Sequence, residues 1–139
     1  MIAQALVAAK LADIATRLAM VEKHRLPSAS GDDAAPEARD LVAFNVMLAV
    51  QGAADVAAHI VADQSWIAAR TAAESFERLA QHGVIPVDLA GRLQRAVAFR
   101  NLVAHGYAKL NLSPLHDAAT HGAEDLESFM SAVASWTSG

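Results

Sequence analysis

The fold of this chain is decided by one stretch, Pro36–Asp63, which reads PEARDLVAFNVMLAVQGAADVAAHIVAD. A proline suits the first turn of a helix, where its missing amide hydrogen is not needed, and the acidic Glu37 favours the positive end of the helix dipole. The stretch is apolar almost all the way round a helical wheel, which is typical of a helix enclosed by others. We therefore predict a long central helix over residues 36–63.

Composition also favours an all-helical protein. The chain has 139 residues, of which 54% are hydrophobic and 5% aromatic, and roughly a quarter are alanine. This apolar content excludes intrinsic disorder, and alanine is the best helix former. The length suits a single domain over residues 1–139.

The chain before the central stretch predicts a first helix, from about residue 3 to 25. Apolar residues recur there at a spacing of three to four, which is a helix-packing pattern. The members of this seam are Val7, Leu11, Ile14, Leu18 and Val21. A loop is predicted over residues 27–33, where proline, serine, glycine and aspartate gather.

Three further helices are predicted after the central one. A connection over residues 64–70 leads to Thr71 and Glu74, a capping box that opens a short helix ending at Gly83. Pro86 opens a fourth helix, which runs at least to Arg100. Ser113, with a proline after it, is the expected N-cap of a fifth. The seam of the fifth helix is Leu115, Ala119, Gly122, Leu126, Phe129, Val133 and Trp136.

These elements predict an all-α, up-and-down bundle of four to five helices. No strand alternation stands out. Because small bundles of thin, alanine-rich helices often complete their core by pairing, we expect a homodimer.

Charge and cysteine content limit the function. The formal net charge is −4 and there is no cysteine. A protein that coats nucleic acid would be basic, so any contact with RNA must be local. Disulfides, thiolate metal sites and cysteine nucleophiles are excluded. No apolar stretch looks long enough to span a bilayer, and charged residues interrupt the N-terminus where a signal peptide is apolar. We expect a cytoplasmic protein without a membrane contact.

The segment Phe99–Tyr107 carries the residues best suited to chemistry. Arg100 is permanently cationic and can donate hydrogen bonds to two phosphate oxygens at once, whereas His105 can exchange protons near neutral pH. Together they suit chemistry on a phosphodiester. An arginine and a histidine five residues apart are also common by chance, and a histidine near a helix end often only complements the dipole. The pair alone therefore leaves both interpretations open.

The surroundings of this pair narrow the choice. They include Thr71-x2-Glu74-Ser75-Phe76, Gly83-Val84-Ile85, Leu89-x3-Leu93 and then Phe99–Tyr107. From about Leu48 to Leu110 the chain resembles the HEPN superfamily, and more narrowly the HepT-type toxins, which pair with a nucleotidyltransferase antitoxin of the MntA type.

The resemblance implies a metal-independent endoribonuclease toxin, built as a helical homodimer and needing no cofactor. Arg100 and His105 would be the catalytic pair, Asn101 the polar residue that supports them, and Tyr107 the tyrosine that the antitoxin adenylylates to silence the toxin. The alternative is a non-catalytic helical module that partners a nucleotidyltransferase and keeps the motif for contact.

RNA supplies its own nucleophile, the 2′-hydroxyl, so a base and a cation suffice for cleavage. On an ideal helix, however, residues five apart lie about 140° around the axis. One straight helix would not aim Arg100 and His105 at one point. We therefore expect the site to be shared between two subunits.

A stripe on the central helix offers a supporting group. It runs through Leu41, Phe44, Leu48, Gln51, Asp55 and His59. We expect Asp55 to be buried, and a buried carboxylate must find partners. Gln51 and Asp55 would then orient Arg100 or His105, or else form an internal network or a polar dimer seam that sets register.

Two other charged groups are weaker candidates. The cluster His116, Asp117, His121, Glu124 and Asp125 has metal-like spacings, but a solvated helix face is the favoured interpretation, so no metal site is predicted. Arg92 and Arg95 are expected to be solubilising charges, with phosphate steering as the alternative.

Overall fold

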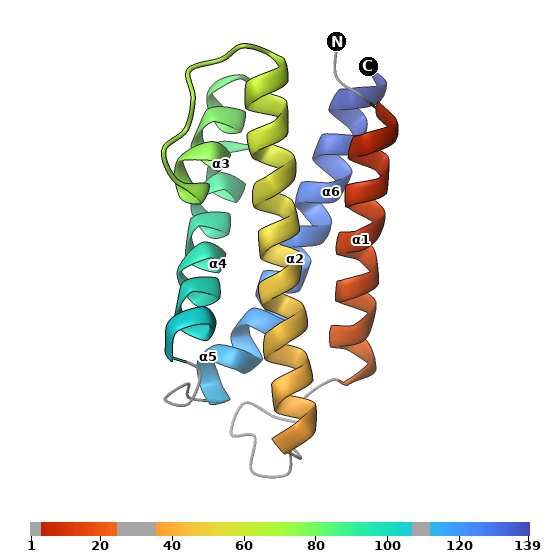
Figure 1. Cartoon of the computed structure of the whole chain (residues 1–139), viewed down its shortest axis with the longest axis vertical. Helices are drawn as coiled ribbons and strands as arrows, with labels where there is room; N and C mark the ends of the chain where they lie inside the picture. The colour runs from red at the N-terminus through yellow and green to blue at the C-terminus, as the bar shows by residue number, and fades with distance from the viewer. Residues whose placement is uncertain (1–3, 25–35, 107–111) are drawn as a thin grey trace.

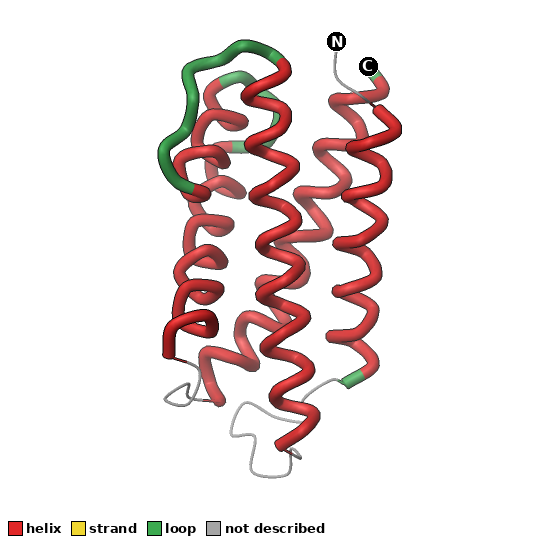
Figure 2. The backbone as a smooth tube through the Cα atoms, viewed as in Figure 1, coloured by secondary structure: helices red, strands yellow, loops and turns green. Residues whose placement is uncertain are grey.

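A computed structural model describes residues 4–24, 36–106 and 112–139 of the chain. Every regular element in these ranges is helical, as Figure 2 shows. The elements, in chain order, are α1 (Gln4–Lys23), α2 (Pro36–Asp63), α3 (Ala72–Gln81), α4 (Val87–Gly106), α5 (Leu112–Asp117), a π-helical segment (Ala118–Gly122) and α6 (Ala123–Ser138). The predicted all-α, up-and-down bundle is confirmed (Figure 1).

Helix α2 is the central element, with the bounds that the sequence predicts. It packs against α1, α3, α4 and α6, and Figure 1 shows it between the α1–α6 pair and the α3–α4 pair. From the sequence, we predict that no stretch is long and apolar enough to span a bilayer. This prediction is wrong, because Glu37–Asp63 has the length and the composition of a membrane-spanning helix. In its most apolar 18-residue window, 56% is buried inside the bundle, as expected for the core helix of a bundle.

The packing of α1 on α2 depends on a glycine. A Cβ atom at Gly52 would lie only 2.9 Å from Cγ1 of Ile14, which is itself buried. The seam predicted for the first helix is confirmed at four of its five positions, Leu11 being half-buried. A polar contact joins the same two helices, because Arg17 Nη1 donates to Oδ1 of the buried Asn45 over 3.3 Å.

Helix α3 begins and ends by the local chemistry that the sequence predicts. The Oγ1 atom of Thr71 accepts a hydrogen bond from the Glu74 amide at 3.0 Å, which is the capping contact. Gly83 follows the helix in a left-handed conformation with φ +76°, which favours glycine. The connection before α3 is anchored by Trp66, whose ring stacks on His82 at 3.8 Å between ring centroids.

The predicted fifth helix is confirmed as one continuous run of α5, the π-helical segment and α6. It begins at Leu112 rather than with a cap at Ser113. Leu126, Phe129 and Val133 of its seam are fully buried. The π-helical segment widens one turn of the backbone, and α5 lies obliquely to α6 across it (Figure 1). The π-helical segment contacts α4. Single π-helical turns of this kind are frequent at functional sites.

Candidate active site and the adjoining cleft

The last two turns of α4 carry the arginine and histidine of the motif. Nε and Nη2 of Arg100 both donate to Oδ1 of Asn101, at 3.2 and 2.8 Å. This forked contact holds the guanidinium against the neighbouring amide. The structure thus brings two of the three predicted catalytic residues into direct contact.

His105 is exposed in the last turn of α4. No hydrogen bond or ion pair between His105 and Arg100 is found within the described part of the chain. This agrees with the angle of about 140° that an ideal helix puts between them. Tyr107 lies outside the described residues.

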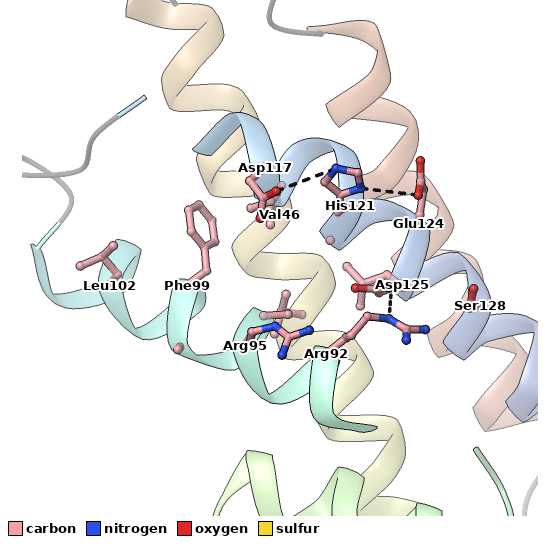
Figure 3. Close-up of a pocket in the computed structure, with 16 residues that line it drawn as sticks. Val46, Arg92, Arg95, Phe99, Leu102, Asp117, His121, Glu124, Asp125 and Ser128 are labelled. Carbon is pink, nitrogen blue, oxygen red and sulfur yellow. Dashed lines mark hydrogen bonds and ion pairs between the residues drawn. The ribbon is translucent and has the colours of Figure 1, made fainter. Parts of the chain in front are cut away.

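A cleft of about 880 Å³ borders α4. Its walls are α4 on one side and the π-helical segment with α6 on the other, and α2 forms its floor (Figure 3). Phe99 and Leu102 line it from α4, and Val46 and Val50 from α2. Leu102 and His105 are three residues apart and are neighbours on one face of α4, although His105 itself does not line the cleft.

The α4 wall of the cleft carries two arginines that differ in their partners. Arg92 Nε donates to Asp125 of α6 at 2.8 Å, and its Nη1 donates to Asp88 at 3.1 Å. These contacts raise the pKa of Arg92, with Asp125 as the larger cause, and the Arg92 hydrogen bond lowers the pKa of the exposed Asp88 carboxyl. Arg92 therefore ties α4 to α6, which corrects its interpretation as a solubilising charge. Arg95 is exposed, as expected.

The opposite wall is acidic. His121 lies between two carboxylates, with Nε2 4.0 Å from Asp117 and Nδ1 3.8 Å from Glu124 (Figure 3). All three side chains are mostly exposed, as the solvated-face interpretation expects. Across the described ranges, no three histidine or acidic side chains converge closely enough to hold a metal ion.

Gln51 and Asp55, the predicted supporting residues on α2, do not lie in the cleft beside α4. Gln51 and Asp55 are exposed and line a groove between α1 and α2, together with Lys10, Asp13 and Arg17. The prediction that Asp55 is buried is therefore wrong, and neither residue lines the cleft beside α4. The reason is that this face of α2 stays open to solvent along the groove beside α1 and is not covered by another helix. A role for Gln51 and Asp55 at an interface between two copies stays a prediction.

Sequence reasoning named the arginines of the cleft but missed the cleft itself. The i,i+4 spacing of Asp88 and Arg92 could have suggested their pairing. Nothing in the sequence relates Arg92 to Asp125, which lies 33 residues away.

The all-helical bundle and the residues at the end of α4 fit the class of HEPN proteins that the sequence resembles, and comparison with known proteins identifies the family. The family model described as ribonuclease HepT-like matches residues 14–133. A curated relative, the mRNA nuclease HepT of Shewanella oneidensis, is 30% identical over 95 residues, which are 68% of this chain and 71% of the relative. The chain belongs to the ribonuclease HepT-like family, and it is an endoribonuclease of the HEPN type.

Solved structures agree with this fold. The tri-AMPylated HEPN toxin of Shewanella oneidensis, in complex with its MNT antitoxin, matches with a TM-score of 0.84 and 26% identity over 93% of this chain and 96% of that one. A toxin–antitoxin complex with AMP-PNP matches with a TM-score of 0.82 and 25% identity over 91% and 96%. The cytosolic protein YutE of Bacillus subtilis, of unknown function, shares the fold at 11% identity, with a TM-score of 0.83 over 97% and 90%.

Proposed function

We propose that this chain is a toxin that cleaves RNA without a metal ion, by attack of the ribose 2′-hydroxyl on the adjacent phosphorus. The proposal rests on the forked contact of Arg100 with Asn101 in a chain whose family is ribonuclease HepT-like. The 2′-oxygen to phosphorus bond forms as the bond to the 5′-oxygen breaks. The products are a 2′,3′-cyclic phosphate and a 5′-hydroxyl end.

Each residue of the motif has a role in this step. His105 removes the proton from the 2′-hydroxyl or returns one to the departing 5′-oxygen. Arg100 stabilises the charge that grows on the non-bridging oxygens. Asn101 is a positioning residue, because its amide oxygen holds the guanidinium in one orientation.

A homodimer would complete the site. His105 performs one proton transfer in each step, so the partner subunit would supply the other. Exposed apolar side chains support an interface near the motif: Leu41 and Phe44 lie early in α2, and this end of α2 lies at the same end of the bundle as the end of α4 (Figure 1).

We propose that the toxin is regulated by covalent modification of a tyrosine. A solved relative is a tri-AMPylated toxin bound to an MNT antitoxin. By this likeness, a cognate MntA-like nucleotidyltransferase would adenylylate Tyr107 and silence the chain. We place both partners in the cytoplasm.

An RNA cleavage assay in EDTA tests the catalytic proposal. The parent chain should cut RNA at an unchanged rate in EDTA and leave cyclic-phosphate and 5′-hydroxyl ends. His105→Ala should lower the rate about 10²–10⁴-fold, the range for a lost general acid or base, and Arg100→Ala about 10²–10³-fold.

The matched control is Arg70→Ala, which removes a highly exposed arginine outside the motif and should leave the rate unchanged. A parent rate that both motif variants retain would contradict the catalytic roles of Arg100 and His105. A parent chain that cuts no RNA would favour the non-catalytic module that partners a nucleotidyltransferase. A rate abolished by EDTA would contradict the metal-free mechanism.

A further inference from the structure

Arg95 is a cation that no described residue pairs with. It is exposed on α4 and points into the cleft beside Arg92 (Figure 3). Arg92 is held by Asp88 and Asp125, so its hydrogen-bonding groups are largely occupied. Of the two arginines in the cleft, Arg95 is therefore the one whose guanidinium stays available to a ligand.

The distribution of charge in the cleft favours an anion on the α4 wall. Asp117 and Glu124 stand on the opposite wall on either side of His121, and they repel negative charge. Asp125 is neutralised by Arg92. A linear anion in this cleft would thus be pushed away from the π-helical segment and attracted to Arg95.

One face of α4 leads from Arg95 to His105. Residues 95, 98, 102 and 105 fall within an arc of about 80° on an ideal helix. Ala98 and Leu102 line the cleft between the two ends of this strip. Ten residues of helix span about 15 Å. Because a stacked strand rises about 3.4 Å per nucleotide, this distance corresponds to about four nucleotides.

We propose that Arg95 binds a phosphate of the RNA about four nucleotides from the linkage that is cut. This inference rests on the proposed ribonuclease function and extends it with a substrate-binding residue outside the catalytic motif. A guanidinium suits the task because it can donate two parallel hydrogen bonds to phosphate oxygens. A local cation of this kind would let a chain with a net charge of −4 hold RNA.

Binding can be measured without cleavage on a 2′-O-methyl RNA of eight nucleotides, whose 2′-oxygen cannot attack. By fluorescence anisotropy, Arg95→Gln should bind this RNA several-fold more weakly, and the slope of log affinity against log salt should fall by about 0.7, the value for one phosphate contact on a single strand. Arg95→Lys keeps the charge and should retain most of the slope.

Arg70→Gln is the matched control, because it removes one positive charge from a highly exposed arginine outside the cleft. It should leave affinity and slope as in the parent. An unchanged affinity and slope in Arg95→Gln would overturn the proposal, and so would an equal loss in Arg70→Gln.

Cleavage of short and long substrates provides a second readout. Arg95→Gln should lower kcat/KM on an eight-nucleotide RNA and leave it unchanged on a dinucleotide, which is too short to reach Arg95. An equal loss on both substrates would overturn the proposal, because Arg95 would then act at the cut linkage or through the fold. Failure of the parent chain to cut either RNA would contradict the ribonuclease function, whereas the anisotropy measurement would still decide whether Arg95 binds a phosphate.

Discussion

Asn101 illustrates how a single residue can order the side chain of an arginine that we propose to be catalytic. Arginine has a long side chain with many rotamers, and ordering it costs conformational entropy. The two hydrogen bonds from the Arg100 guanidinium to Oδ1 of Asn101 limit those rotamers before any substrate binds. A hydrogen-bond acceptor directly after the arginine therefore contributes to the site without touching the reacting atoms.

A prediction at the scale of single residues concerns the adenylylation of Tyr107. The chain contains one tyrosine, so a nucleotide attached through tyrosine can only be on Tyr107. When the chain is produced together with its MntA-like nucleotidyltransferase, its mass should rise by one or more steps of about 329 Da, the mass of an added adenylate. Intact-mass spectrometry of Tyr107→Phe should show no step. Mass steps that persist in this variant would place the modification elsewhere.

At the scale of the elements, the packing of α1 on α2 depends on a close contact between the two helices. Gly52 lets the backbone of α2 approach Ile14 of α1. Ile14 is buried, and its Cγ1 atom is near the β-branch rather than at a flexible end, so it has little freedom to move. The sequence shows a glycine within a helix, where it lowers helix propensity, but only the packing shows why it is there.

Replacement of Gly52 by alanine should therefore destabilise the fold. Overpacking costs about 1–3 kcal/mol, and better helix propensity offsets at most about 1 kcal/mol of that. Urea unfolding should show a lower midpoint with an unchanged slope. The matched control is Gly91→Ala in α4, where a Cβ meets nothing within 4 Å, so the free energy of unfolding should rise by the propensity gain of about 0.5–1 kcal/mol, and the midpoint should rise with it. A rise for both variants would contradict the close-contact argument.

At the scale of the whole molecule, the position of the motif favours an assembly of two copies. Arg100 and His105 belong to the same helix end but point in different directions around it. The exposed apolar side chains Leu41 and Phe44 on α2, at the same end of the bundle, would be covered by a second copy. A twofold axis at this end would bring one copy's arginine toward the other copy's histidine.

Mixing two inactive variants tests this arrangement. Dimers of Arg100→Ala chains and dimers of His105→Ala chains should each be inactive. Random heterodimers should recover measurable activity, at most about a quarter of the parent rate, because half of the dimers are mixed and each mixed dimer brings one intact Arg100 and one intact His105 together at one of its two sites, without the second histidine. The measurement is RNA cleavage after the two chains are mixed and allowed to exchange. The absence of any recovery would show that each site is formed within one copy.

Some of the fold and of the site follows from the sequence because the responsible interactions are local. The cap of α3 involves Thr71 and Glu74, three residues apart, and it forms as predicted. The seams of α1 and α6 follow from helical periodicity, which states which residues share a face. The motif itself is contiguous, so a resemblance over one segment was enough to name its residues.

The tertiary structure alone decided which helix faces are covered and which groups meet across the fold. The stripe through Gln51 and Asp55 shares one face of α2, as its spacing requires, but that face is turned outward rather than into the core. Likewise, the cleft exists because the π-helical segment and α6 stand opposite α4, joined by Arg92 and Asp125. Periodicity sets positions around one helix axis, whereas the covering of a face depends on how several axes pack together.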